Sequence, residues 1–243
     1  MIGLGTIVNT AAIVLAGVFG KLFGGRLTER FQDTLIKACG VSVIFIAIAG
    51  VMSKMLAVDG AALSSGKSVL LVLAIAIGAL IGEAINIEDA FERFGEWLKR
   101  KTGNAKDATF VDAFVTASLT VSIGAMAVVG AIRDGLSGDS SVLITKAILD
   151  FVIILVMTSS LGKGCAFSAI PVLVLEGGLT LLARLIAPVM TDAALANLSL
   201  VGSVLIFCVG VNLTFGKRVR VANLLPALIL AVIFAFLPLS FLN

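Results

Sequence analysis

Eight apolar segments follow one another along the chain, separated by short polar connections. Most of them approach the roughly 20 residues that an α-helix needs to cross the hydrocarbon layer of a bilayer. Of the 243 residues, 59% are hydrophobic and 14% are charged, whereas a soluble domain carries about 25% charged residues. We therefore expect an all-α, polytopic transmembrane helix bundle that forms a single domain over residues 1–243, embedded in a lipid bilayer. The segments are 2–23, 38–55, 68–87, 113–132, 142–161, 164–186, 195–215 and 221–242.

We expect about eight crossings, although two segments are short. The uncharged cores of the second and third segments have only 16 and 15 residues. Six or seven crossings result if one segment is re-entrant, or if the fifth and sixth segments insert only halfway. With eight crossings, thirteen of the 18 Lys and Arg residues lie on one side and five on the other. Because basic loops stay in the cytoplasm, this distribution predicts that both termini are outside.

The composition argues against several classes of function. The sequence has no His, no Gly-x-Ser-x-Gly motif, no phosphate-binding loop and no HExxH motif. Cys39, Cys165 and Cys208 lie in apolar stretches without a CxxC spacing, which favours small buried side chains over a disulfide or a metal site. The net charge of +3 is too small and too scattered for nucleic-acid binding. We expect no enzymatic activity, no cofactor and no metal.

Two polar connections have the pattern of amphipathic helices. Residues 21–37 place Phe31 and Leu35 at helical spacing among charges, and residues 88–106 do the same with Phe94 and Trp97. Both segments are predicted to lie in the cytoplasmic interface, with Trp97 at the level of the lipid headgroups. A solvated helical extension of a neighbouring span is the alternative for each.

The fifth and sixth segments each contain one carboxylate, and they are joined by a Gly-Lys-Gly turn at residues 162–164. Asp150 lies twelve residues before this turn and Glu176 twelve residues after it. At a rise of about 1.5 Å per residue, both acids lie roughly 18 Å from the turn, near the middle of a hydrocarbon layer about 30 Å thick. Acids at that depth face a bundle interior or a wet cavity. The pair predicts a polar path through the membrane.

Each acid has an alternative, purely structural interpretation. Lys146 precedes Asp150 by one helical turn, so the two can form a local ion pair that only helps the helix to insert. In the functional interpretation, Asp150 holds a proton or cation and Lys146 is its neutralising neighbour. Glu176 precedes Gly177 and Gly178, which permit close helix contact or a break with free carbonyl groups beside a cation. Otherwise a protonated Glu176 only forms a hydrogen bond across a helix pair.

Neutral oxygens in other spans complete the candidate site. Asn9 in the first segment, Ser122 in the fourth and Asn212 in the seventh could line one cavity with the two acids. Hydrogen bonding between helices is the alternative role for each of them. Rows of small residues, such as Gly78 and Gly82, permit close packing of helices and are compatible with a homo-oligomer.

Weak internal similarity suggests a repeat. The Gly-Leu-Gly string at residues 3–5 corresponds to Gly-Lys-Gly at residues 162–164, and Asp33 corresponds to Asp192, both at a spacing of 159. In the eight-span topology these segments run in opposite directions. An inverted duplication of the first two spans onto the sixth and seventh is a feature of many secondary transporters.

Four strings carry a resemblance that extends over nearly the whole chain. They are G-T-I-V-N-T at residues 5–10, S-I-G-A-M-A-V-V-G-A-I-R-D-G-L-S-G-D at 122–139, L-I-T-K-A-I-L-D-F at 143–151, and L-G-K-G with S-A-I-P-V-L at 161–173. With these strings the sequence resembles the YqgA-like or YdfK-like group of bacterial inner-membrane proteins of unknown function. The resemblance implies a multi-pass protein of the bacterial inner membrane, and it implies no substrate or site.

Two functions remain from these features. The first is a transporter or channel-like permease for a small solute or cation, in which Asp150 and Glu176 bind a proton or cation together with Lys146, Asn9, Ser122 and Asn212. The second is a non-transporting membrane scaffold or sensor that acts through its amphipathic cytoplasmic helices. The first requires a polar, hydrated surrounding for the acids, and the second a dry and fully packed bundle.

Overall fold

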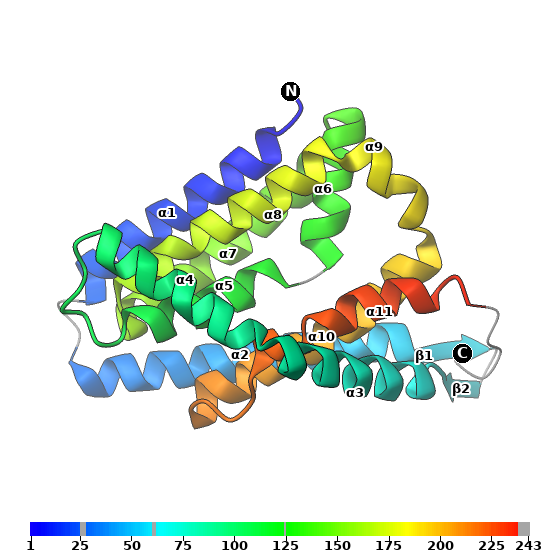
Figure 1. Cartoon of the computed structure of the whole chain (residues 1–243), viewed down its shortest axis with the longest axis horizontal. Coiled ribbons are helices and arrows are strands. Elements are labelled where there is room, and N and C mark those ends of the chain that lie inside the picture. The colour runs from blue at the N-terminus through cyan, green and yellow to red at the C-terminus, as the bar shows by residue number, and fades with distance from the viewer. Residues whose placement is uncertain (25–27, 60–61, 124, 238–243) are drawn as a thin grey trace.

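A computed structural model describes residues 1–24, 28–59, 62–123 and 125–237, and it confirms an all-α helix bundle (Figure 1). Six helical segments of this described part are long and apolar enough to cross a membrane. They are α1 (Leu4–Gly24), α2 (Glu29–Met55), α3 (Ser68–Ile85), α7 (Ser141–Leu161), the continuous η1 (Lys163–Ser168) and α8 (Ala169–Leu181), and α10 (Asp192–Phe215).

Two of the eight predicted segments differ from simple spans. The fourth is broken into α5 (Phe110–Ser122) and α6 (Ala125–Ser137), whose axes bend by 62° at the break. The eighth contains η3 (Val221–Leu224) and α11 (Pro226–Phe234), which together are short for a span. Its predicted end at residues 238–242 lies outside the described residues. Counting the bent pair as one span gives seven, by length and composition.

Several short elements connect the spans. Strands β1 (Leu56–Asp59) and β2 (Ala62–Ser65) form an antiparallel hairpin between α2 and α3, with Leu56 opposite Ser65. This hairpin was not predicted from the sequence. The helices α9 (Ala183–Ile186) and η2 (Ala187–Val189) lead from α8 to α10.

One of the two predicted amphipathic segments is a separate helix. This helix, α4 (Ile87–Lys101), follows α3 after a left-handed residue, Asn86, with φ of 50°. It buries Leu98, while Phe94 and Trp97 stack on each other and remain 39% and 48% exposed. The other segment, 21–37, has no helix of its own in the described residues. It is divided between the end of α1 and the beginning of α2, so a helical extension of the spans describes it better.

The long helices pack in two layers. In one layer α1 lies along α7 and α8, and in the other α2 lies along α10 (Figure 1). Helix α3 packs on α11, and α7 also contacts α2 and so joins the layers. Glycines permit the close approach of α3: a Cβ atom at Gly82 would overlap the main chain of Asn223, and one at Gly78 would come within 2.6 Å of the Ala227 side chain.

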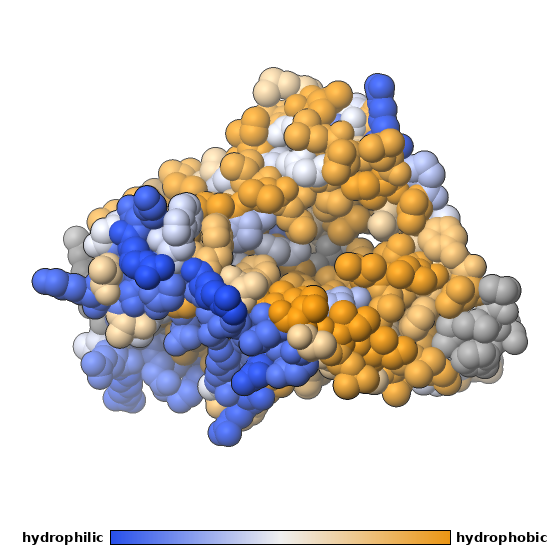
Figure 2. Space-filling model, viewed as in Figure 1, coloured by the Kyte–Doolittle hydropathy of each residue, from blue (hydrophilic) through white to orange (hydrophobic). Residues whose placement is uncertain are grey.

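The outer surface of the bundle is apolar, and the polar residues gather at one end. Large side chains such as Phe45, Val72 and Leu80 are 65–73% exposed, which is unusual for a soluble monomer and normal for a surface in contact with lipid. Figure 2 shows orange, apolar residues over most of the visible face and a blue, hydrophilic region at its lower left. The end of α1 and the connections after α4, α7 and α10 lie at this end, since their residues line shared cavities there.

Candidate functional site

Helix α7 brings Lys146 and Asp150 to one face, because residues four apart are neighbours on a helix. Their side chains form an ion pair, and only 7% and 6% of the two side chains are exposed. This burial distinguishes the pair from the surface pairs elsewhere in the chain, such as Lys37 with Asp33. A buried ion pair is retained only when further hydrogen bonds satisfy its atoms, and other elements supply them.

Helix α8 contributes Glu176 from the opposite side of this pair. Its Oε1 atom accepts a hydrogen bond from Asn9 Nδ2 of α1 at 2.9 Å and lies 3.6 Å from Lys146 Nζ. Glu176 and Asn9 are both fully buried. Lys146 therefore contacts both predicted acids, and this places them at the same height in the bundle.

The break between α5 and α6 provides the third side of the site. Helix α5 ends at Ser122, and Ile123 has an extended backbone conformation with ψ of 122°. The last carbonyl groups of a helix lack an intrahelical donor, and the Val121 carbonyl accepts a hydrogen bond from Lys146 Nζ at 2.6 Å. A charged side chain paired with an unwound backbone is an arrangement used at the ion sites of membrane transporters.

Three buried polar atoms at this site make no hydrogen bond within the described part of the chain. They are Asn9 Oδ1, Ser122 Oγ and Glu176 Oε2. An unpaired polar atom in a dry interior costs about 1–3 kcal/mol. Two of these atoms belong to Asn9 and Glu176, which are hydrogen-bonded to each other, so a proton or another small polar group at this pair would complete its hydrogen bonds. Four of the predicted site residues form one connected cluster, in which Glu176 contacts Asn9 and Lys146, and Lys146 contacts Asp150. Ser122 follows Val121 in the chain.

Asn212 is not part of this cluster. Its side chain accepts hydrogen bonds from the Arg218 and Val219 amides at 2.8 and 2.9 Å, and it donates to the Val219 carbonyl at 2.7 Å. These bonds close the turn after α10. Asn212 therefore stabilises this turn and does not lie beside the acids.

The glycines after Glu176 form neither the helix break nor the close helix contact that the sequence allowed. Helix α8 continues without a break through Gly177 and Gly178. A Cβ atom at Gly178 would meet nothing within 4 Å, and one at Gly177 only the Thr6 methyl group at 3.9 Å. The unwound backbone beside the acids comes from the α5–α6 break instead.

Two threonines and a further acid at the site were not predicted. Thr6 and Thr180 lie one turn from Asn9 and Glu176, and their hydroxyl groups are 3.3 Å apart. That spacing is visible in the sequence and could have identified them. Asp134 of α6 is fully buried and accepts hydrogen bonds from the Gly3 and Gly5 amides at 3.2 and 2.9 Å. It caps the beginning of α1 from a distance of about 130 residues, which no local pattern reveals.

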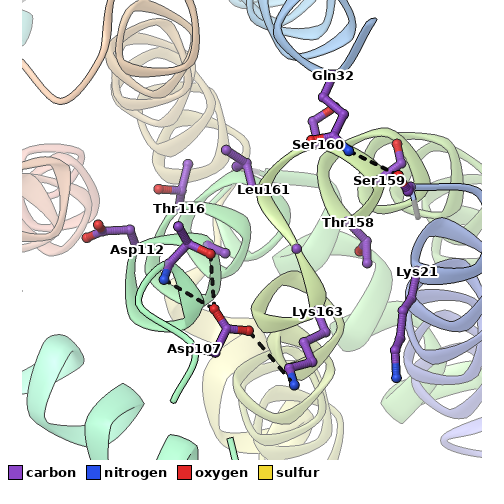
Figure 3. A pocket seen from close by; sticks show the side chains of 14 residues that line it. Lys21, Gln32, Asp107, Asp112, Thr116, Thr158, Ser159, Ser160, Leu161 and Lys163 are labelled. Carbon is purple, nitrogen blue, oxygen red and sulfur yellow. Dashed lines mark hydrogen bonds and ion pairs between the residues drawn. The ribbon is translucent and has the colours of Figure 1, made fainter. Parts of the chain in front are cut away.

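A cavity of about 740 Å³ opens at the basic end of the bundle, between α1, α5 and the end of α7 (Figure 3). Asp112 and Lys21 lie on opposite sides of it in this view. Hydroxyl groups line its interior, and those of Thr158 and Ser160 make no hydrogen bond in the described residues. The hydroxyl residues are Thr109, Thr116, Thr158, Ser159 and Ser160.

The cavity stops short of the buried cluster. Thr158 follows Asp150 by eight residues on the same face of α7, about 12 Å along the helix axis. Ile154 lies between them on that face and is fully buried. The cavity is thus open toward the basic end and closed toward the acids by an apolar layer that includes Ile154.

Charged residues also join the helices at the basic end. Glu83 of α3 pairs with Arg220 at 2.7 Å and accepts a hydrogen bond from Asn223 at 2.6 Å. Lys217 pairs with Glu92 and Glu88 of α4 at 2.7 and 3.1 Å. Partial burial lowers the pKa of Lys217, but these two carboxylates outweigh it and raise the pKa above its ordinary value. The contacts fix α4 against the turn before α11.

A metal centre is not suggested by the donor groups. The described residues contain no group of three or more His, Cys, Asp or Glu side chains with suitable spacing. At the buried cluster, the oxygens of Asp150, Val121 and Glu176 face the Lys146 ammonium. A cation coordinated by them would lie beside this fixed positive charge.

Comparison with known proteins gives a family and two relatives. A family model described as "Protein of unknown function (DUF554)" matches residues 4–236. The chain is 31% identical over 232 residues to the uncharacterized protein YqgA of Escherichia coli strain K12, covering 94% of each chain. It is 25% identical to the uncharacterized membrane protein YdfK of Bacillus subtilis strain 168, covering 96% of this chain and 95% of that relative. No solved structure matches the chain.

Proposed function

The chain belongs to the DUF554 family of proteins of unknown function, and from the geometry of its buried site we propose that it is a membrane transporter or channel-like permease for a small solute or cation. One observation carries this proposal. Lys146, Asp150 and Glu176 meet inside an apolar bundle, beside a broken helix, and unpaired polar atoms remain among them. Ionisable residues inside a membrane are costly and usually mark an ion or substrate path.

The arrangement of the bundle supports the same function. The polar cavity gives access from the basic end to within about 12 Å of Asp150 along α7. Residues of α1, α5, α7 and α8 meet at the cluster, so a shift of α6 at the break would change which side of the bundle reaches it. Broken helices at a central site are a device for such alternating access.

The direction of the proposed path follows from the basic residues. We infer that the hydrophilic end with thirteen Lys and Arg residues faces the cytoplasm. With α11 as the eighth crossing, the protein then lies in the bacterial inner membrane with both termini outside, and the cavity is its cytoplasmic vestibule. The proposal involves no enzymatic step.

The test is transport by the purified protein in phospholipid vesicles. A pH-sensitive dye inside the vesicles reports proton movement driven by a potassium diffusion potential, and parallel assays follow Na⁺ and K⁺ uptake. We expect flux of at least one of these ions above that of protein-free vesicles. In Asp150→Asn and Glu176→Gln variants the flux should fall to the protein-free level, because the charge that binds the ion is gone.

The matched control is Glu96→Gln, which removes an exposed carboxylate of α4 that pairs only at 3.6 Å with Lys99. Its flux should equal that of the unmodified chain. Unchanged flux in both acid variants, with helical content retained, would remove the two acids from the path.

A membrane scaffold or sensor is the second candidate, and α4 is the feature that favours it. Phe94 and Trp97 stack with centroids 5.7 Å apart and leave an aromatic surface exposed beside the basic end. Trp97 is the only Trp in the sequence, so its fluorescence reports on this surface. Bound lipid would allow quenching by brominated phospholipid, whereas a bound soluble partner would shield it from iodide.

A further inference from the structure

Among the described residues, only Lys146 pairs with the two carboxylates of the buried cluster, so one negative charge is left unbalanced when both are ionised. Lys146 carries one positive charge, and Asp150 and Glu176 carry two negative charges when both are ionised. Lys146 pairs directly with Asp150 and stands 3.6 Å from Glu176. An unbalanced charge in a membrane interior is expensive, so this site requires one further positive charge.

Asn9 and Glu176 each keep one acceptor atom without a hydrogen-bond donor among the described residues. Asn9 Nδ2 donates to Glu176 Oε1 at 2.9 Å. The second oxygen of the same carboxylate, Oε2, and the second polar atom of the same amide, Oδ1, are both buried acceptors without a donor among the described residues. A carboxylate and an amide carbonyl have only lone pairs to offer each other. One hydrogen on Glu176 Oε2 converts it into a donor, and an amide and a carboxylic acid can pair through two parallel hydrogen bonds.

The alternative positive charge is a metal cation, and the donors argue against it. Sodium-like and calcium-like ions are held by several oxygen ligands. Three oxygens that could coordinate such an ion, from Val121, Asp150 and Glu176, already face the Lys146 ammonium. This ammonium occupies the position that a bound cation would take.

We propose that Glu176 is protonated in this state of the protein, paired with Asn9, and that the particle exchanged at the buried site is a proton. The role in exchange rests on the proposed permease function, whereas the protonation itself does not. Release breaks the O–H bond at Oε2, leaves the electron pair on the carboxylate and passes the proton to water. The new carboxylate then competes with Asp150 for Lys146, whose ammonium also holds the Val121 carbonyl at the helix break.

The charged groups around Glu176 are few. From α7, Lys146 and Asp150 face it, and α1 supplies only the neutral Asn9 and Thr6. Asp134 of α6 is engaged with the amides at the beginning of α1. Arg133 and Arg184, on α6 and α9, are exposed, and Lys163 of η1 is at the basic end near Asp107.

Infrared spectroscopy of the full-length protein in lipid films tests this directly, because a protonated carboxyl group has its own C=O stretching band. We expect this band at neutral pH, with a downward shift in D₂O. It should be lost in Glu176→Gln and retained in Asp150→Asn and in the exposed control Glu96→Gln. Glu176→Gln keeps the shape and hydrogen-bonding capacity of the acid, so it should retain the native helical content. In Asn9→Leu the band should move to higher wavenumber, because the acid loses its amide partner.

A band that persists in Glu176→Gln, or that disappears in Asp150→Asn instead, would overturn the assignment. So would the absence of the band in the folded, unmodified chain at neutral pH. These outcomes are independent of transport. A protonated Glu176 in vesicles without any ion flux would support the protonation and contradict the permease function. Sodium-driven flux with an ionised Glu176 would contradict the protonation and support the permease function.

Discussion

Lys146 connects every charged group of the buried site. Its ammonium group contacts the carboxylates of Asp150 and Glu176 and the Val121 carbonyl, from three different helices. Removing one partner of a buried ion pair leaves the other unbalanced, which costs far more than the pair itself contributes. At the scale of the residue, the stability of the site thus depends on the Lys146 ammonium group.

The substitution Lys146→Met should therefore be strongly destabilising. Methionine fills a similar volume but leaves Asp150 without a counter-charge, so we expect a loss of about 3–5 kcal/mol in the free energy of unfolding. Unfolding by SDS, followed by far-UV circular dichroism, measures this loss. The double variant Lys146→Met with Asp150→Asn should recover most of it, because no buried charge then lacks a partner.

The control for the Lys146 variants is Lys54→Met, at the exposed end of α2. It should change the stability by less than about 0.5 kcal/mol. If the double variant is no more stable than Lys146→Met alone, the ammonium has a role other than balancing Asp150.

Part of the site could be predicted from the sequence at this scale. The positions of Asp150 and Glu176 relative to the turn at residues 162–164 predicted their common depth, and their contacts with Lys146 agree with it. The Val121 carbonyl could not be predicted, because a backbone oxygen has no sequence signature until the helix break is known. Asn212 was grouped with the acids by residue type alone, and its side chain instead closes the turn after α10.

Helix ends and helix contacts decide which elements hold the site together. The first turn of α1 is capped by Asp134 of α6, and α3 approaches η3 closely enough that Gly82 contacts the Asn223 main chain. Both are contacts between elements far apart in the chain. At the scale of the element, glycines and capping residues therefore stabilise contacts with elements that lie far away in the chain.

Replacing Asp134 with Ala should loosen the beginning of α1. The carboxylate accepts bonds from two amides that lack helical partners, and losing a cap costs about 0.5–2 kcal/mol. We expect faster hydrogen exchange at the Gly3, Gly5 and Thr6 amides, measured by mass spectrometry.

The matched control is Asp139→Ala, whose carboxylate accepts a bond from the Ser141 amide at the beginning of α7 at 3.1 Å. Bonds from Ser141 lower the pKa of Asp139, so this cap is present at neutral pH and is lost only as the pH falls below the ordinary Asp range. Its loss should leave exchange in α1 unchanged. Equal exchange of the α1 amides in the Asp134 variant and the unmodified chain would contradict the assigned cap.

Gly82→Ala and Gly178→Ala should have opposite effects. A methyl group at Gly82 would overlap the Asn223 main chain, and such overpacking costs about 1–3 kcal/mol. Gly178 also lies inside a helix, but nothing lies within 4 Å of a Cβ atom there, so alanine should stabilise the helix by about 0.5–1 kcal/mol. Unfolding by SDS compares the two. A stable Gly82→Ala variant would mean that α3 and η3 separate readily.

The spans could be predicted from the sequence, whereas the break between α5 and α6 and the β1–β2 hairpin could not. The positions of seven of the eight apolar segments correspond to long helices or to the bent pair α5–α6, because length and apolarity suffice to define a crossing. The break at Ile123 and the β1–β2 hairpin have no comparable signal, since tertiary contacts decide where a single apolar run bends.

Three helix contacts describe the architecture of the whole molecule. The first predicted span packs on the sixth, the second on the seventh and the third on the eighth, as α1 with α8, α2 with α10, and α3 with α11. These contacts are compatible with a two-fold axis in the membrane plane that exchanges the paired spans. They do not require one, because spans related by such an axis need not touch and α1 packs most extensively on α7, the fifth span. The inverted repeat stays a prediction.

The orientation of the whole molecule can be tested at the two ends of the bundle. Lys21 lines the cavity at the basic end, and Leu63 is 66% exposed on the β1–β2 hairpin. Because basic loops stay in the cytoplasm, a membrane-impermeant maleimide should label Lys21→Cys only in inside-out vesicles and Leu63→Cys only in intact spheroplasts. The native Cys165 is buried, and Cys39 and Cys208 are half-buried within spans, so the unmodified chain provides the background.

Labelling of Lys21→Cys from outside would place the cavity on the opposite side of the membrane. Labelling of both variants from one side would mean an even number of crossings between them, which contradicts a single crossing by α2.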